Sequence, residues 1–310
     1  MFMLRGIAVS LAFFALLYSL LSLLVLCTWR YLMLLRPGER RAEFLFWMRI
    51  APLVASAAVT LALVVPAYVR LEPRSIDEDI AVPLALGFGC LFLMGLGLFR
   101  VVVAHKKSAR IVTGWLAGAD ALDASVPAPL FRTHQHAPPL TLVGVCSPSI
   151  VVSDATVDRL TTDELHVAVQ HEIAHMRSRD NLKKLVFHCS PFPGMGPLEA
   201  AWQDAAELAA DDQAVTSVRE ALDLAAALIK LSRILPARLA PAFTMALVSG
   251  NSSLTLRVER LLAWEEGRAC RSTVFSSYIV PLACAALLAA IASYGPALTV
   301  THAISEWLVR

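Results

Sequence analysis

The sequence predicts an α-helical integral membrane protein of four transmembrane helices, with one mainly α, α+β globular domain inserted between spans three and four. The 310-residue chain is 57% hydrophobic and only 17% charged, whereas a soluble domain carries about 25% charged residues. The charges are also unevenly distributed, because four windows contain no Asp, Glu, Lys or Arg: 6–29, 50–69, 80–99 and 272–305. A simple cytosolic enzyme, a secreted disulfide scaffold and a disordered regulator are therefore excluded.

Each charge-free window is long enough to cross a hydrocarbon core, which takes about 20 apolar residues. We expect transmembrane helices at about 6–29, 50–69, 80–104 and 275–298. The first window is interpreted as a retained span, because it is too long for the h-region of a signal peptide and no small-residue cleavage site follows it. The expected domains are 1–104 for three spans, 105–271 for the globular domain, and 272–310 for the fourth span and a short tail.

Basic residues flank the spans on one side of the membrane. The stretch 30–49 carries five arginines and 100–110 carries four Lys or Arg residues, whereas 70–79 mixes two arginines with four acidic residues. Since basic flanks mark the cytoplasmic side, we expect a multi-pass protein of the inner (cytoplasmic) membrane, with the lipid bilayer as a partner. Both termini are then outside, and the globular domain is cytoplasmic.

Net charge and cysteine usage narrow the expected partners. A net charge of +2 gives no indication of a nucleic-acid partner, and the basic residues cluster beside the spans, where they meet lipid headgroups. The six cysteines are scattered, with no CxxC pair. This pattern indicates a reduced compartment and no cysteine-based zinc knuckle.

Local patterns predict the first elements of the globular domain. The β-prone runs Leu140–Val145 and Ile150–Val152 flank the turn signal CSPS, which predicts a hairpin. Thr161 or Thr162 then caps a helix, which we expect to continue to about residue 187. The stretch 109–139 is Ala-, Pro- and His-rich and gives no clear prediction.

Two further helices are expected downstream. Glu199–Val218 is interpreted as one of them. The other covers about 253–263 as an amphipathic helix, with Arg257 and Arg260 on its solvated face. The apolar stretch 185–198 is too short to span a membrane and contains three prolines, so we interpret it as an interfacial or re-entrant lid over the site.

The strongest chemical signal is His171-Glu172-Ile173-Ala174-His175 in the first predicted helix. His171 and His175 are four residues apart, so a helix places both imidazoles on one face, as two corners of a tetrahedral zinc site require. Glu172 stands beside a ligand, where a general base is needed. The alternative is a helix with exposed His and Glu side chains. It is disfavoured, because the motif occurs by chance in roughly one chain in a hundred of this length.

A catalytic zinc ion needs a third protein ligand and one open position. Glu207 and Asp211 are also four residues apart in a predicted helix. We expect Glu207 to be the third ligand and Asp211 to accept the distal N–H of a ligand histidine. The alternative, acidic residues on a solvated face, loses weight beside the first motif. The expected cofactor is Zn²⁺, and the expected activity is that of a zinc metalloendopeptidase.

Four segments resemble the BlaR/MecR-type membrane metallopeptidases of the gluzincin group: SPSIVVSD (147–154), LTTDELHVAVQHEIAHMRSRDNL (160–182), ELAAD (207–211) and SLTLRVERLLA (253–263). The resemblance implies a zincin-type domain in the cytoplasmic loop between spans three and four. Carried over residue by residue, it implies that zinc is bound by His171, His175 and Glu207. It also implies that Glu172 is the general base and that Asp211 contacts a ligand histidine. It also implies an antirepressor role in signal transduction, with a transcriptional repressor as the protein substrate.

One feature of the antibiotic-sensing members is expected to be missing. Those members add an extracellular penicillin-binding domain with a nucleophilic serine in S-x-x-K. Here no lysine follows a serine by three residues. We therefore expect a member without that sensor domain, which receives its signal through the spans, the 70–79 loop or a separate sensor partner.

Two other functions stay open at the level of sequence. One is a membrane quality-control zinc protease similar to the Ste24/HtpX group. The other is a non-catalytic, zinc-binding membrane signal transducer. For the enzyme, we expect hydrolysis of peptide bonds in a cytosolic or membrane-proximal protein. His188 is considered for transition-state stabilisation, against a role as an ordinary loop histidine.

Overall fold

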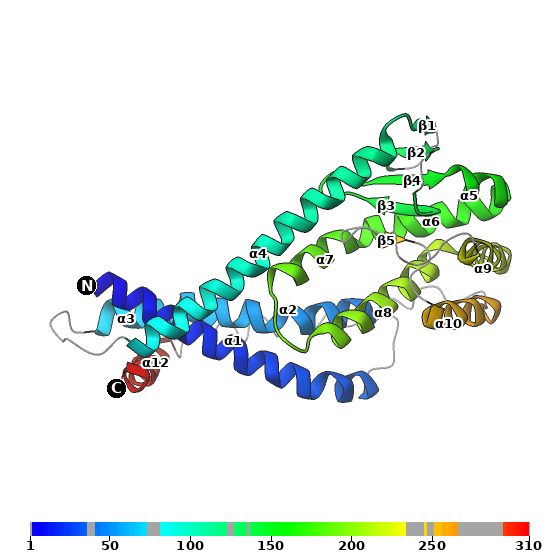
Figure 1. Cartoon of the computed structure of the whole chain (residues 1–310). Helices are drawn as coiled ribbons and strands as arrows, with labels where there is room; N and C mark the ends of the chain where they lie inside the picture. The colour runs from blue at the N-terminus through cyan, green and yellow to red at the C-terminus, as the bar shows by residue number, and fades with distance from the viewer. Residues whose placement is uncertain are drawn as a thin grey trace.

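The computed structural model describes residues 2–35, 41–72, 81–122, 127–134, 137–233, 245–246, 251–265 and 294–309. The described chain is mostly helical, with long apolar helices at one end and a small sheet packed on shorter helices at the other (Figure 1). The predicted fourth span at about 275–298 falls outside the described residues, except for 294–298 at the start of the last helix.

Three helices in the described ranges are long and apolar enough to cross a membrane: Phe2–Leu34, Arg41–Leu71 and Ala81–Leu116. They correspond to the first three predicted spans, and their length and composition indicate a membrane protein. The elements at this end are α1 (Phe2–Leu35), α2 (Arg41–Val59), η1 (Thr60–Val64), α3 (Val65–Leu71), α4 (Ala81–Leu116) and α12 (Tyr294–Val309). The π-helical segment η1 joins α2 and α3 into one rod.

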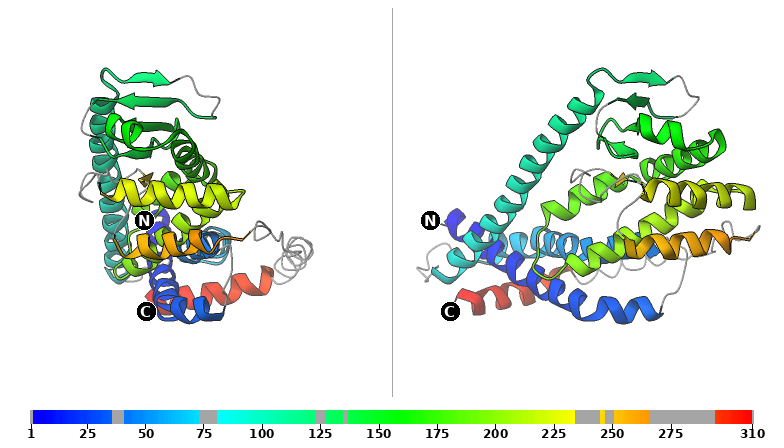
Figure 2. Two further views of the ribbon diagram at one scale, coloured as in Figure 1. Left: turned by 90° about the vertical axis from the view of Figure 1, so that its right-hand side faces the viewer. Right: turned by 45° about the vertical axis from the view of Figure 1, so that its right-hand side comes forward.

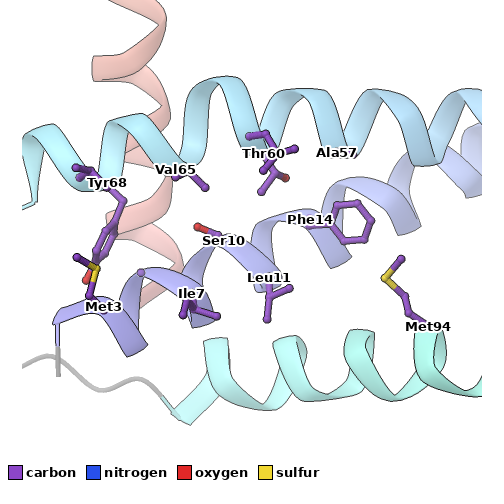
Figure 3. A pocket seen from close by; sticks show the side chains of 13 residues that line it. Met3, Ile7, Ser10, Leu11, Phe14, Ala57, Thr60, Val65, Tyr68 and Met94 are labelled. Atoms are coloured by element: carbon purple, nitrogen blue, oxygen red, sulfur yellow. The ribbon is translucent and has the colours of Figure 1, made fainter.

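An apolar cavity of about 430 Å³ opens between α1, the η1–α3 segment and α4. Ile7 and Phe14 of α1 lie between Val65 of α3 and Met94 of α4 (Figure 3). Such a lining is compatible with hydrocarbon surroundings, in which polar side chains are costly.

The helix α4 connects the membrane end to the globular domain without a break. Its 36 residues span about 54 Å at 1.5 Å per residue, more than the roughly 30 Å of a hydrocarbon core. Near its end, Trp115 packs against Val143 and Val151, and its carbonyl accepts a hydrogen bond from Thr133 Oγ1 at 2.6 Å. Figure 2 shows α4 running from the apolar helices to the sheet.

The sheet has the strand order β1-β2-β4-β3-β5. Its strands are β1 (Asp120–Leu122), β2 (Leu130–Thr133), β3 (Leu140–Val143), β4 (Ser149–Ser153) and β5 (Met245–Ala246). β3 and β4 are antiparallel, with Leu140 opposite Val152, which confirms the predicted hairpin. β1 and β2 come from the stretch 109–139, for which there was no clear prediction, and the two-residue β5 pairs with β3.

Among the described residues, six helices complete the domain: α5 (Asp154–Arg159), α6 (Thr162–Ser178), α7 (Asp180–Cys189), α8 (Gly196–Ala214), α9 (Val218–Ser232) and α10 (Asn251–Leu262). α6 begins where predicted, because Thr161 and Glu164 form a reciprocal capping box. The prediction of one helix to about residue 187 is wrong. α6 ends at Ser178, and Arg179 takes a left-handed conformation with φ of 54°, which redirects the chain into α7.

α6 lies between the sheet and the helices α8 and α9. Val167 and Ile173 of α6 belong to one buried cluster with Leu142 and Ile150 of the hairpin and Leu228 of α9. Burial of this helix on both sides places the His-Glu-x-x-His motif at the centre of the domain.

The stretch 185–198, predicted to form a lid, instead ends α7 and begins α8. Phe187, Met195 and Leu198 are buried in a cluster with Leu45 and Phe46 of α2. The apolar side chains therefore hold the α7–α8 connection against the membrane helices.

Candidate metal centre

α6 and α8 bring three predicted ligands together. The side chains of His171, His175 and Glu207 each offer one atom within 4.8 Å of the others, and none is more than 1% exposed. Close approach of the helices is possible because α8 presents the small, buried residues Ala206 and Ala210 beside Glu207. The residues therefore converge in the interior, where only mutual pairing or a bound ion can satisfy them.

The geometry of the three side chains fits a cation. The Nε2 atoms of His171 and His175 face each other at 3.0 Å, close to the separation of about 3.3 Å that two nitrogen ligands have on a tetrahedral zinc ion. Glu207 Oε2 lies 3.5 Å from His171 Nε2, and Oε1 lies 3.8 Å from His175 Nε2. Neither Glu207 oxygen accepts a hydrogen bond of regular geometry in the described part of the chain. Two imidazoles and one carboxylate are a donor set that zinc takes in catalytic sites.

The distal nitrogen of each histidine meets a carboxylate. His171 Nδ1 lies 3.0 Å from Asp211 Oδ1, and His175 Nδ1 lies 2.8 Å from Asp180 Oδ2. A carboxylate at this position fixes the ring orientation and leaves Nε2 for the metal. Asp211 was predicted in this role, whereas Asp180 was not. The only sequence signal for Asp180 is that a carboxylate stands five residues after the second histidine, and its position depends on the left-handed turn at Arg179.

Arg257 of α10 is the second functional residue that was not predicted from the sequence. The prediction that it lies on a solvated face is wrong, because the side chain is 1% exposed. Its Nη1 lies 2.9 Å from Glu207 Oε2, while Nε and Nη2 each donate a 2.7 Å hydrogen bond to Asp211. α10 packs against α8 and α9, so this arginine reaches two buried carboxylates. Arg260 pairs with Asp212 at a partly exposed position.

The charges around the site keep its carboxylates ionised. Burial by itself raises the pKa of Glu207, but Arg257 and His175 hold that pKa well below the usual value. The pKa of Asp211 is lowered in the same way, because Arg257 and His171 outweigh burial. For His175, burial acts to lower the pKa, but Glu207 and Asp180 raise it to about 10. A metal ion binding at Nε2 therefore takes the place of a proton.

Glu172 lies in the same interior with one oxygen held and one available. It is fully buried, and Oε2 accepts a 2.7 Å hydrogen bond from the backbone N–H of Leu142 in β3. Oε1 is buried and has no hydrogen-bond partner among the described residues. Burial raises the pKa of the Glu172 carboxyl, against the opposing charges of His175 and His171. A carboxyl with these properties can take up a proton and return it.

β3 is fixed beside Glu172 from a second direction. Asn181, the second residue of α7, donates hydrogen bonds to the carbonyls of Gly144 at 2.9 Å and Leu142 at 3.3 Å. His188, in contrast, is not brought to the centre. It is exposed on α7, and its Nδ1 contacts the Lys184 carbonyl of its own helix at 2.8 Å.

Two histidines one turn apart on a helix, a glutamate from a crossing helix and a buried acid beside them define a metallopeptidase-type centre. Residues 134–261, which include all of these side chains, match the family model described as BlaR1 peptidase M56. The match confirms the resemblance to the BlaR/MecR-type family. No curated protein matches the chain. Together with the three apolar helices, the family match indicates a membrane-associated metallopeptidase.

Proposed function

We propose that this protein is a zinc metalloendopeptidase of the inner membrane that cleaves a cytosolic or membrane-proximal protein. The observation that carries the proposal is the buried convergence of His171, His175 and Glu207 next to Glu172, whose Oε1 has no hydrogen-bond partner in the described part of the chain. In this proposal, the first three residues hold zinc and Glu172 is the general base. Asp211 and Asp180 orient the two histidines.

The metal and the protein contribute different parts of the chemistry. Zinc bound at this site supplies a Lewis acid that polarises a peptide carbonyl and activates water. Glu172 accepts the proton of the attacking water at Oε1 and transfers it to the leaving amine, a role that its raised pKa favours. Arg257 keeps Glu207 and Asp211 ionised without occupying a histidine nitrogen.

The biological role is proposed from the family match. A peptidase M56 domain that follows three apolar helices, with arginines on the flank that we assign to the cytoplasm, suits regulated proteolysis of a transcriptional repressor. Such an antirepressor would act in signal transduction, with a separate sensor partner or the spans receiving the signal. Both termini are then outside the cytoplasm.

Metal content and cleavage test the proposal separately. The full chain in detergent is expected to carry about one zinc ion by elemental analysis, and Glu207→Gln is expected to carry much less. Glu172→Gln is expected to keep zinc and to cleave a degenerate peptide library at least about 100-fold more slowly than wild type.

Three results would contradict parts of this proposal. A folded wild type that binds no metal would contradict the proposed enzymatic activity. Full retention of zinc by Glu207→Gln would show that Glu207 is not a ligand. If zinc-loaded wild type releases no more product than zinc-loaded Glu172→Gln, this site does not carry out the cleavage. That result favours the non-catalytic transducer.

A further inference from the structure

A buried arginine joins the membrane helices to the globular domain. Arg49 lies in α2, within the second membrane-type helix, and is only 1% exposed. Its Nε pairs with Glu199 Oε1 at 2.8 Å. Its Nη2 donates to the carbonyl of Ser190 at 2.6 Å and to that of Phe187 at 3.5 Å, and its Nη1 donates to Ser190 Oγ at 3.3 Å. One guanidinium therefore contacts three residues of the segment formed by α7, α8 and the turn between them (180–214), called the α7–α8 hairpin below.

These contacts suit the two helix ends that meet at Arg49. Ser190 is the C-cap of α7, where carbonyl groups lack partners within the helix and carry partial negative charge. Glu199 stands in the first turn of α8. Tyr18 of α1 adds a hydrogen bond to the Ser190 carbonyl at 3.1 Å. The hairpin is therefore held to both α1 and α2 at one point.

α7 and α8 also carry side chains of the metal centre, at positions away from Arg49. α7 begins at Asp180, whose carboxylate contacts His175 Nδ1. α8 carries Glu207 eight residues after Glu199, which is about 12 Å along the helix. Between these points, Phe187 and Trp202 pack edge to face, with ring centroids 4.9 Å apart. The contacts of Arg49 therefore lie on the two helices that carry Asp180 and Glu207.

We propose that Arg49 is a positioning residue that couples the membrane helices to the metal centre. Its contacts transmit a displacement of α2 to the α7–α8 hairpin, and so to the side chains that orient His175 and complete the ligand set. This inference rests on the proposed function. It provides a route by which a signal in the spans reaches the site through the protein's own helices.

The test uses the full chain in lipid nanodiscs, loaded with zinc. Arg49→Gln removes the charge and most of the donors, and Arg49→Lys keeps the charge but not the fork of donors. Arg41→Gln is the matched control, because Arg41 lies on the same helix with an exposed side chain. Two quantities are measured: hydrogen exchange of peptides covering 187–199, and the rate of zinc release to a chelator.

We expect Arg49→Gln to speed exchange in 187–199 and to speed zinc release about 10-fold, the range of a lost supporting contact behind a metal ligand. Arg49→Lys should show a smaller change of both, and Arg41→Gln neither. If Arg49→Gln does not fold, Glu199→Gln carries the same test, with a smaller change in the same direction, because its side chain is 33% exposed.

The outcomes separate the coupling from the metallopeptidase itself. Faster exchange with unchanged zinc release would reduce Arg49 to an anchor of the hairpin and overturn the coupling alone. Unchanged exchange in Arg49→Gln would overturn it too. A wild type that binds no zinc would overturn the proposed function, and the coupling with it.

Discussion

Arg257 Nη1 lies 2.9 Å from Glu207 Oε2, with both side chains at most 2% exposed. The same guanidinium binds both oxygens of Asp211. One cation from α10 therefore balances the charges of two carboxylates. These are Glu207, which faces both histidines of the metal site, and Asp211, which contacts His171. Its position makes α10 part of the metal centre, although α10 contributes no predicted ligand.

Arg257→Met is expected to destabilise the domain strongly, because it leaves two buried carboxylates without their cation. Breaking a buried ion pair costs about 3–5 kcal/mol. Thermal unfolding of the full chain in detergent measures the effect. Arg260→Met is the matched control, since its pair with Asp212 is one-third exposed and is expected to contribute at most about 1 kcal/mol. Similar losses in the two variants would contradict the prediction.

Asp180→Asn is expected to weaken zinc binding by about 10- to 100-fold while the protein stays folded, because His175 loses the carboxylate that orients its ring. Competition with a chromogenic chelator measures the affinity. Asp204→Asn, at an exposed position of α8, should leave it unchanged. Equal zinc affinity in wild type and Asp180→Asn would show that the contact between Asp180 and His175 does not contribute to metal binding.

Lys230→Met is expected to lower stability at neutral pH and to flatten its dependence on acid. Burial acts to raise the pKa of Glu164, but hydrogen bonds from Lys230 and Thr161 lower it below the usual value. This contribution is fully present above the unfolded pKa near 4.5 and is lost as pH falls through the lower folded pKa.

Unfolding temperatures of wild type and Lys230→Met should therefore differ at pH 7 and converge as the pH falls through the lowered pKa of Glu164. The difference at pH 7 should be about 1 kcal/mol, because Lys230 is 40% exposed and solvent screens the pair. Arg219→Met removes a more exposed pair between the same two helices and should change little. A difference between wild type and Lys230→Met that persists at low pH would refute the assignment to Glu164.

Arg179→Gly is expected to stabilise the domain by up to about 1 kcal/mol. Arg179 has φ of 54°, a conformation that costs a side-chain-bearing residue about 1–2 kcal/mol and glycine very little. Arg177→Gly, at an exposed position in the last turn of α6, should instead destabilise, by at most about 1 kcal/mol. Opposite signs in thermal unfolding support the left-handed turn, and equal signs contradict it.

Three features that depend on neighbouring residues could be predicted from the sequence. The charge-free windows predicted the three apolar helices, because hydrophobic length is a local property. Thr161 and Glu164 predicted the start of α6 through a capping pattern of four residues. The spacing of His171 and His175 placed both rings on one helix face, and the structure brings them to within 3.0 Å.

Contacts between distant segments were decided only by the tertiary structure. Arginine is seldom fully buried unless it is paired. Arg257 in an amphipathic helix is therefore predicted to be solvated, and only the packing of α10 against α8 shows that it is buried. Arg49 is separated from Glu199 by 150 residues, and no local pattern links them. Local sequence patterns are sufficient to predict the apolar helices and the start of the ligand helix. The packing of helices against one another decided which charges surround the ligands, because burial forces each charge to find a partner wherever it lies in the chain.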